Sequence, residues 1–156
     1  MTGQPADRRG WLVVGTLVVL LVGLGFEDRR AHADEADRVE ECVSATVAAR
    51  TLADRKVSSM ADYVRPALNG AFTPEVRTGL SRLVGGVARE SVAPLDAARS
   101  TCARIDVRPW HGDLKGRVDG CLETLDARLT WLDDVARDGT AAFTSAPAST
   151  AGCGAR

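Results

Sequence analysis

Aromatic residues are scarce in this chain, making up 4% of its 156 residues. Pockets for small molecules are typically lined by apolar and aromatic side chains with a few convergent polar groups. The shortage of aromatic residues therefore argues against a deep ligand pocket. It also predicts a core of Val, Leu and Ala, which suits closely packed helices.

Motifs that carry chemistry are lacking as well. The four cysteines form no C-x-x-C pair, and neither His32 nor His111 has a cysteine or histidine partner at metal-ligand spacing. Gly85-Gly86 follows no predicted strand, as a phosphate-binding loop would. Asp133-Asp134 lies on a predicted solvent-facing helix surface without the converging partners that acid–base catalysis needs. We expect a protein that is not an enzyme and uses no cofactor or metal.

A concentrated basic surface is also missing. The formal net charge is −1, and charges of both signs are interspersed along the chain rather than grouped in blocks. Domains that bind nucleic acid usually gather their basic residues on one face or along one helix. We therefore expect no nucleic-acid partner.

The chain does have one unbroken apolar run, residues 11–26. As a helix this run would be about 24 Å long, from a rise of about 1.5 Å per residue. A membrane-spanning helix usually needs about 17–25 apolar residues, whereas the apolar core of a signal peptide has about 7–15. The run lies between these classes, so residues 1–33 are predicted to be either a single-pass membrane anchor or a signal peptide.

Two export signals fit the flanking residues. Ala31 and Ala33 are small residues spaced for cleavage by signal peptidase, although residues 27–30 place four charges before them. Arg8 and Arg9, followed by Gly10-Trp11-Leu12, resemble the paired-arginine pattern of a twin-arginine export signal. Export by the general secretory route and by the twin-arginine route both stay open.

The compartment follows from the cysteines more than from the charges. Arg8 and Arg9 precede the apolar run and Arg29 and Arg30 follow it, so the positive charges give no clear orientation. Four cysteines in the remainder favour an oxidising compartment. We expect a cell-membrane protein whose C-terminal domain is extracytoplasmic, or a protein secreted after cleavage at Ala33.

The rest of the chain is predicted to be all-α. Apolar residues recur at spacings of three and four in residues 34–64, 73–105 and 113–137. The first helix should end at Arg65-Pro66, because a residue before proline is disfavoured in helical conformation. The second should break near Ser91–Pro94, where Ser91 could cap a new helix, and its apolar line contains Val76, Leu80, Leu83 and Val87.

Together these helices predict an antiparallel three-helix bundle, up-down-up, in residues 34–138. The apolar line of the third helix is Leu114, Val118, Cys121, Leu125, Leu129 (or Arg128), Leu132 and Val135. Residues 139–156 are small and polar without an apolar period, so we expect a disordered C-terminal tail.

All four cysteines are predicted to form disulfides. If the chain reverses at about residue 111, Cys102 and Cys121 lie at nearly the same distance from the turn, which favours a Cys102–Cys121 bond. Reversal at about residue 69 would place Cys42 one to two turns from Cys102. With Cys102 bonded to Cys121, Cys42 would pair with the remaining cysteine, Cys153. Cys42–Cys121 and Cys42–Cys102 are the competing pairings. Alternatively, the cysteines on the helices could be small buried apolar residues.

Residues 106–113 form the most function-like stretch, a turn that contains Arg108, Trp110 and His111. Trp and Arg are enriched among the residues that dominate binding energy at interfaces. The simpler interpretation, which we favour, is structural: Trp110 covers the end of the core and Asp113 caps the third helix.

The leading functional hypothesis is a non-catalytic, membrane-anchored or secreted helical protein that acts by protein–protein contact in the cell envelope. Its expected partners are the membrane, through residues 11–26, and another envelope protein. The first alternative is a sensor or regulator that binds a ligand at the turn from Arg108 to Asp113. The second is a structural oligomer, a homodimer linked through Cys153.

Overall fold

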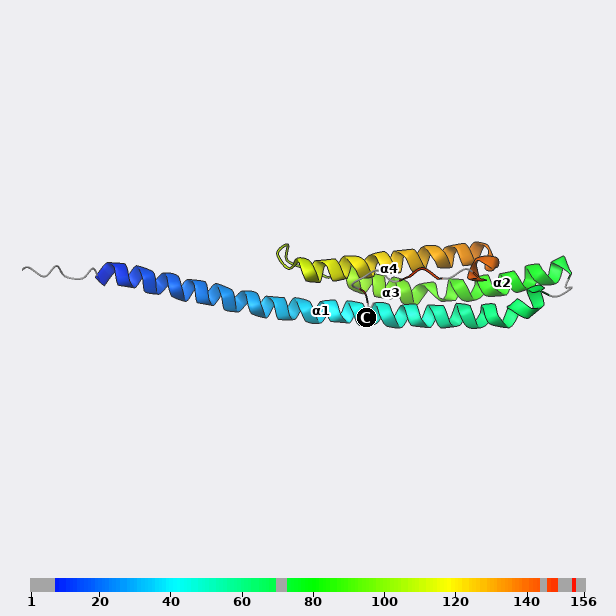
Figure 1. The fold of residues 1–156 in the computed structure, drawn as a ribbon, viewed down its shortest axis with the longest axis horizontal. Coiled ribbons are helices and arrows are strands. Elements are labelled where there is room, and N and C mark those ends of the chain that lie inside the picture. The colour runs from blue at the N-terminus through cyan, green and yellow to red at the C-terminus, as the bar shows by residue number, and fades with distance from the viewer. Residues whose placement is uncertain (1–7, 70–72, 144–145, 149–152, 154–156) are drawn as a thin grey trace, which may run out of the picture.

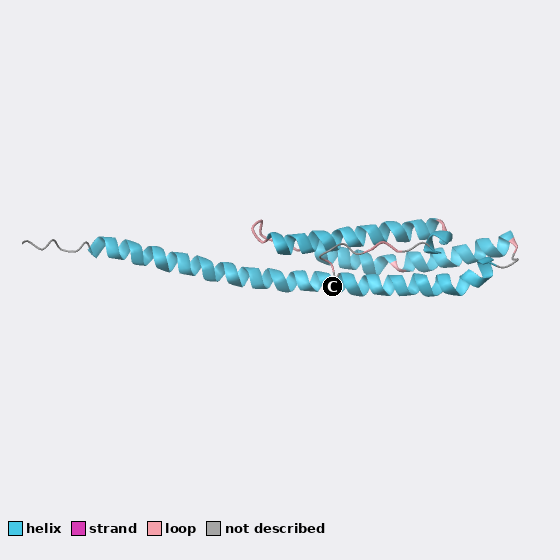
Figure 2. Ribbon diagram, in the orientation of Figure 1, coloured by secondary structure: helices cyan, strands magenta, loops and turns pink. Residues whose placement is uncertain are grey.

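The computed structural model describes residues 8–69, 73–143, 146–148 and 153. Within these residues the fold is all-helical (Figure 2). Its elements are α1 (Arg8–Asn69), α2 (Pro74–Glu90), α3 (Val92–Ala103), α4 (Gly112–Arg137) and a short 3₁₀-helix, η1 (Gly139–Phe143).

Helix α1 is longer than expected at both ends. It is one continuous helix from Arg8, so the apolar run and the first bundle helix belong to the same element, and its N-terminal part extends beyond the other helices (Figure 1). Pro66 lies inside α1, which continues to Asn69, so the expected end at Arg65-Pro66 was wrong. Proline removes one backbone hydrogen bond and bends a helix without always ending it, and α1 bends toward α2 near this end (Figure 1).

The expected break in the second helix is confirmed at Ser91, which separates α2 from α3. The Ser91 hydroxyl donates a 2.8 Å hydrogen bond to the Val87 carbonyl and makes no capping bond to α3, so its expected role as a cap was wrong. Pro94 lies in the first turn of α3, where the missing N–H has no helical partner to lose.

Helices α2 and α3 run back along α1, and α4 then returns beside them (Figure 1). Both α2 and α3 contact α1 and α4. The core between them is aliphatic, as the composition predicts. Its largest fully buried apolar side chains are Leu95, Leu125, Leu132, Val39, Val57, Val64, Val84 and Val135.

Helix α2 buries only part of the predicted apolar line, since Leu80 packs against the core and other residues of the line do not. Its buried residues are Val84, Gly85 and Ala88, whereas Val76 and Leu83 of the predicted apolar line are 42% and 46% exposed. The reason is a close approach of backbones: a Cβ atom at Gly85 would lie 3.0 Å from the Ala136 carbonyl oxygen. Helix α4 therefore packs against the face of α2 that carries Gly85, and Val76 and Leu83 remain exposed to solvent.

For one position in the apolar line of the third helix, the sequence predicts Leu129 or Arg128. In the structure Arg128 is buried and Leu129 is partly buried, and Arg128 Nη1 lies 2.8 Å from Asp54 Oδ1 on α1. Burial raises the pKa of Asp54, and the Arg128 charge opposes this shift. The long arginine side chain therefore reaches across the bundle to a carboxylate instead of facing solvent.

The described part of the C-terminal segment is ordered against the bundle, so the expectation of a disordered tail was wrong for it. Residues Gly139–Phe143 form η1, and Ala142 and Cys153 are buried. Gly139 permits this packing, because a Cβ atom there would lie 2.4 Å from the Ser81 carbonyl oxygen. A disulfide at Cys153 then offsets the entropy of ordering the segment.

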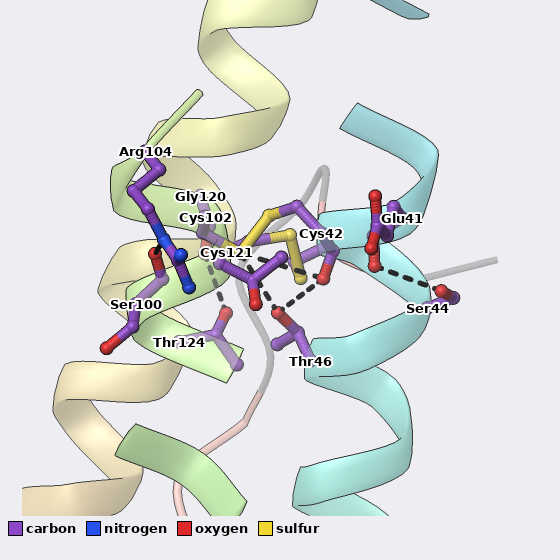
Figure 3. The surroundings of a disulfide bond; sticks show 12 residues. Glu41, Cys42, Ser44, Thr46, Ser100, Cys102, Arg104, Gly120, Cys121 and Thr124 are labelled. Carbon is purple, nitrogen blue, oxygen red and sulfur yellow. Dashed lines mark hydrogen bonds between the residues drawn. A yellow bond between two sulfur atoms is a disulfide. The ribbon is translucent and has the colours of Figure 1, made fainter. Parts of the chain in front are cut away.

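Two disulfides join the four cysteines, Cys42 to Cys102 and Cys121 to Cys153. The expected Cys102–Cys121 and Cys42–Cys153 bonds were therefore wrong, and Cys42–Cys102 is one of the two competing pairings. The reason is the position of the first reversal. Cys42 and Cys102 are 60 residues apart and equidistant from residue 72, between α1 and α2, rather than from residue 69. Cys121 lies beside this bond (Figure 3).

Candidate functional site

The turn between α3 and α4 folds onto one face of α1. Three residues of α1 receive it, Asp28, His32 and Glu35, which are spaced by four and three and therefore lie on the same side of the helix. Three residues of the turn meet them, Arg108, Trp110 and His111. We call these six residues the turn–helix junction.

Glu35 and His111 form the buried centre of the junction. His111 Nδ1 lies 2.6 Å from Glu35 Oε2, and the two side chains are 7% and 5% exposed, respectively. The Arg108 backbone N–H donates to the same carboxylate oxygen, and Arg108 Nε lies 3.5 Å from Glu35 Oε1. The hydrogen bond from His111 lowers the pKa of Glu35, and burial opposes this shift. The carboxylate is thus held in its ionised form by donors from the turn.

Asp28 forms the exposed rim of the junction, about two helical turns closer to the apolar run than Glu35. Its Oδ1 atom accepts a 3.1 Å hydrogen bond from Trp110 Nε1 and lies 3.4 Å from Arg108 Nη1. His111 Nε2 lies 3.7 Å from the same oxygen. One carboxylate oxygen therefore faces all three side chains of the turn.

His32 lies between the two carboxylates along α1. Its ring packs edge-on against the His111 ring, with 4.5 Å between centroids. Its buried Nδ1 atom has no hydrogen-bond partner among the described residues. The two histidines of the chain thus meet at one place, although they are far apart in sequence.

The structural interpretation of the turn was wrong in its details. Trp110 is 67% exposed and does not cover the core, whereas His111 is the buried residue of the turn. No side-chain capping bond is found at the start of α4, so the expected cap by Asp113 is absent there. Polar contacts to α1, rather than an apolar plug, hold the turn in place.

Sequence reasoning missed the α1 half of the junction. The sequence pattern places Asp28 among the charges before the candidate cleavage site, His32 within that site and Glu35 at the start of the predicted helix 34–64. The signal that could have joined them is their spacing of four and three. Ala31 and Ala33, the small residues of that site, lie within the continuous helix α1.

A second surface feature is a shallow depression between α1 and α2. Its lining residues are Lys56, Ser59, Met60, Tyr63, Val87 and Glu90. Tyr63 is 77% exposed at its edge. The depression combines apolar side chains with charged ones and is open to solvent, which is typical of protein-contact surfaces rather than of enclosed ligand sites.

Neither region offers a metal site. Among the residues that the structure describes, no group of three or more His, Cys, Asp or Glu side chains is arranged to hold a metal ion. No described helix has a stretch long and apolar enough to cross a bilayer. In comparisons with known proteins, no family model, curated protein or solved structure matches this chain.

Proposed function

We propose that this chain is a non-catalytic helical protein of the cell envelope, attached to the membrane through residues 11–26. Its helical domain would lie outside the cytoplasm and act by protein–protein contact. The observation that carries the proposal is the composition of α1, which joins an exposed apolar segment to a disulfide-bonded bundle.

The exposed segment supports attachment to an apolar phase. Residues 15–20 are all exposed, and among them Leu17, Val18, Val19 and Leu20 are 52–71% exposed. The four consecutive apolar residues 17–20 cover more than one helical turn, so this part of α1 is apolar on all sides. A helix of that kind is normally surrounded by protein or lipid. A short run can be accommodated by local thinning of the bilayer and by flanking arginines that reach the headgroups.

The junction supports an uncleaved anchor over a cleaved signal. Cleavage after Ala33 would remove Asp28 and His32 and with them the contacts of the turn to this part of α1. Signal peptidase also acts on accessible chain, whereas Ala31 and His32 are half-buried within a helix. We therefore favour the anchored form.

The two disulfides support an extracytoplasmic domain. Structural disulfides persist in oxidising compartments and are rare in the cytosol. Both bonds join elements of the folded domain, Cys42–Cys102 between α1 and α3, and Cys121–Cys153 between α4 and the C-terminal segment. Because Cys153 is bonded within the chain, it is not free to link a homodimer in this structure.

The surface between α1 and α2 supports contact with another protein. The apolar side chains that line it are Met60, Val87 and Tyr63, of which Tyr63 is 77% exposed. Exposed apolar patches rimmed by polar residues mark interaction sites. Tyr63 is the most exposed of these residues, and tyrosine is enriched among hot spots at interfaces.

Two experiments test the proposal. Thiol-reactive labelling of intact native cells, with and without prior reduction, should find all four cysteines protected until reduction. Intact mass spectrometry of the native protein should give an N-terminus before residue 31 and two disulfides. Free thiols on a cytoplasmic domain would contradict the proposed compartment, and an N-terminus at Asp34 would contradict the anchor.

Contact with a protein can be tested by placing a photo-crosslinking amino acid at position 63, with position 119 on α4 as the matched exposed control. We expect a discrete adduct from position 63 in native membranes and none from position 119. The same adduct from both positions, or none from position 63, would argue against the α1–α2 surface.

One observation favours a second candidate function, ligand binding at the turn from Arg108 to Asp113. Trp110 and the side chain of Arg108 are 67% and 42% exposed and lie together. Under this alternative, Trp110→Ala would abolish binding of a ligand from the envelope while the bundle stays folded.

A further inference from the structure

The turn between α3 and α4 forms the end of the bundle from which α1 continues toward Arg8 (Figure 1). Trp110 at this end donates its Nε1 hydrogen to Asp28 Oδ1 at 3.1 Å. Asp28 is two residues beyond Phe26, the last residue of the apolar run, which is about 3 Å along a helix axis. Trp110 is therefore tied to α1 at the level where the apolar run ends.

We propose that Arg108 and Trp110 rest on the lipid headgroups of the membrane that holds residues 11–26, and that this contact fixes the bundle against the membrane surface. The inference rests on the proposed function, because it requires that the apolar run lies in a bilayer.

The exposed side chains at this level have the composition of a membrane interface. Trp110 is 67% exposed, and the Arg108 guanidinium carbon lies 5.8 Å from the centroid of its ring. On α1, Phe26 is 55% exposed, and the Arg30 guanidinium carbon lies 4.4 Å from its ring centroid. Tryptophan is enriched at the boundary between acyl chains and water, and arginine can hydrogen-bond lipid phosphates.

Lipid fits the apolar segment of α1 better than a protein partner because residues 15–20 of that segment are exposed all around the helix. A protein that docks on a helix covers a stripe, whereas residues 15–20 are exposed on every face of α1. A bilayer covers all faces of a helix at once. The bundle would then meet the same bilayer at its first level beyond the run, which is the level of Asp28 and Trp110.

The junction explains why Trp110 is exposed yet ordered. Asp28 holds the indole through Nε1 and Arg108 through Nη1, at 3.1 and 3.4 Å. The buried Glu35–His111 pair holds the base of the turn. The Trp110 ring also packs edge-on against the His111 ring, with 6.1 Å between centroids, and its exposed part can contact headgroups.

The test uses tryptophan fluorescence of the full chain in phosphatidylcholine vesicles that contain a minor fraction of phosphatidylglycerol. Trp11→Phe combined with Trp131→Phe leaves Trp110 as the sole tryptophan. The second substitution removes a buried indole N–H that has no partner among the described residues, so little stability should be lost. Lipids brominated near the headgroup should quench Trp110 strongly, and lipids brominated near the acyl terminus should quench it weakly.

Two matched variants separate the outcomes. With Trp131 alone, which packs against the core of the bundle, neither brominated lipid should quench the emission. With Trp11 alone, the first residue of the apolar run, brominated lipid should quench it if the run enters the bilayer. Quenched Trp11 with unquenched Trp110 would overturn this inference and leave the proposed anchor intact. Unquenched Trp11 would overturn the anchor itself, and quenched Trp131 would overturn the placement of the bundle above the headgroups.

Discussion

His111 Nδ1 lies 2.6 Å from Glu35 Oε2, and this buried contact joins the α3–α4 turn to α1 across 76 residues of sequence. The same carboxylate accepts the Arg108 backbone N–H. A buried carboxylate needs such donors, because an ionised group without them is strongly destabilised. The contact therefore fixes the turn at the place where α1 leaves the bundle, and its strength should depend on pH.

The junction should weaken in acid. The pKa of Glu35 is lowered in the folded state from an ordinary value of 4.5. The unfolded chain therefore takes up a proton at Glu35 more readily than the folded chain does. The stability that this group contributes is present above pH 4.5 and is lost as the pH falls through the lower folded pKa.

The measurement is the melting temperature of the full chain and of Glu35→Gln, in detergent, between neutral and acid pH. The wild type should melt higher at neutral pH, and the difference should shrink below pH 4.5. Glu75 and Asp138, whose pKa values are also lowered, remain in both proteins and cancel in the difference. A difference that stays constant through this range would show that Glu35 contributes no ionisation-dependent stability.

Trp110 and His111 are neighbours whose replacement should affect stability by different amounts. Trp110→Ala should change the free energy of unfolding by less than about 1 kcal/mol, because the side chain is 67% exposed. His111→Ala should cost about 1–3 kcal/mol, because it leaves the buried Glu35 carboxylate without its closest donor. Urea denaturation of both variants checks the order. A larger loss of unfolding free energy for Trp110→Ala than for His111→Ala would instead indicate that the Trp110 ring supports the core.

The helical class of the fold, the break at Ser91 and an aliphatic core could be predicted from the sequence, because each follows from local spacing and composition. The turn–helix junction could not be predicted in this way. It depends on the register between α1 and a turn 76 residues away. Placing the reversal between α1 and α2 at residue 69 instead of residue 72 shifts that register by more than one helical turn.

The buried face of α2 was missed for a related reason. Hydrophobic periodicity favours the largest apolar side chains, Val76 and Leu83 among them, as the core face. In the structure the absence of a side chain at Gly85 decides the packing, since it lets the α4 backbone approach α2. A glycine adds nothing to a hydrophobic pattern, so pattern reasoning alone does not reveal this contact.

Gly85 and Gly86 provide a matched test of that close approach. At Gly86 a Cβ atom would have no neighbour within 4 Å, so Gly86→Ala should stabilise the protein by about 0.5–1 kcal/mol through helix propensity. At Gly85 a Cβ atom would lie 3.0 Å from the Ala136 carbonyl oxygen and 3.3 Å from that of Val135. Overpacking of this kind costs about 1–3 kcal/mol. Thermal unfolding should rank Gly86→Ala above the wild type and Gly85→Ala below it, and equal effects would mean that α4 is free to move away.

The two disulfides should differ in their effect on the bundle, although loop length alone would make them similar. Their sequence separations are 60 and 32 residues, for which chain entropy predicts about 4 kcal/mol each. Cys42–Cys102 joins two core helices, so replacing both cysteines by Ser should cost the bundle most of that amount. Cys121–Cys153 ties the C-terminal segment to α4, and without it this segment can separate while the helices stay packed. We therefore expect Cys121→Ser with Cys153→Ser to lower the melting temperature less than Cys42→Ser with Cys102→Ser. Tryptic mapping without reduction should first recover both linked peptide pairs, and a Cys102–Cys121 peptide in their place would contradict the helix register.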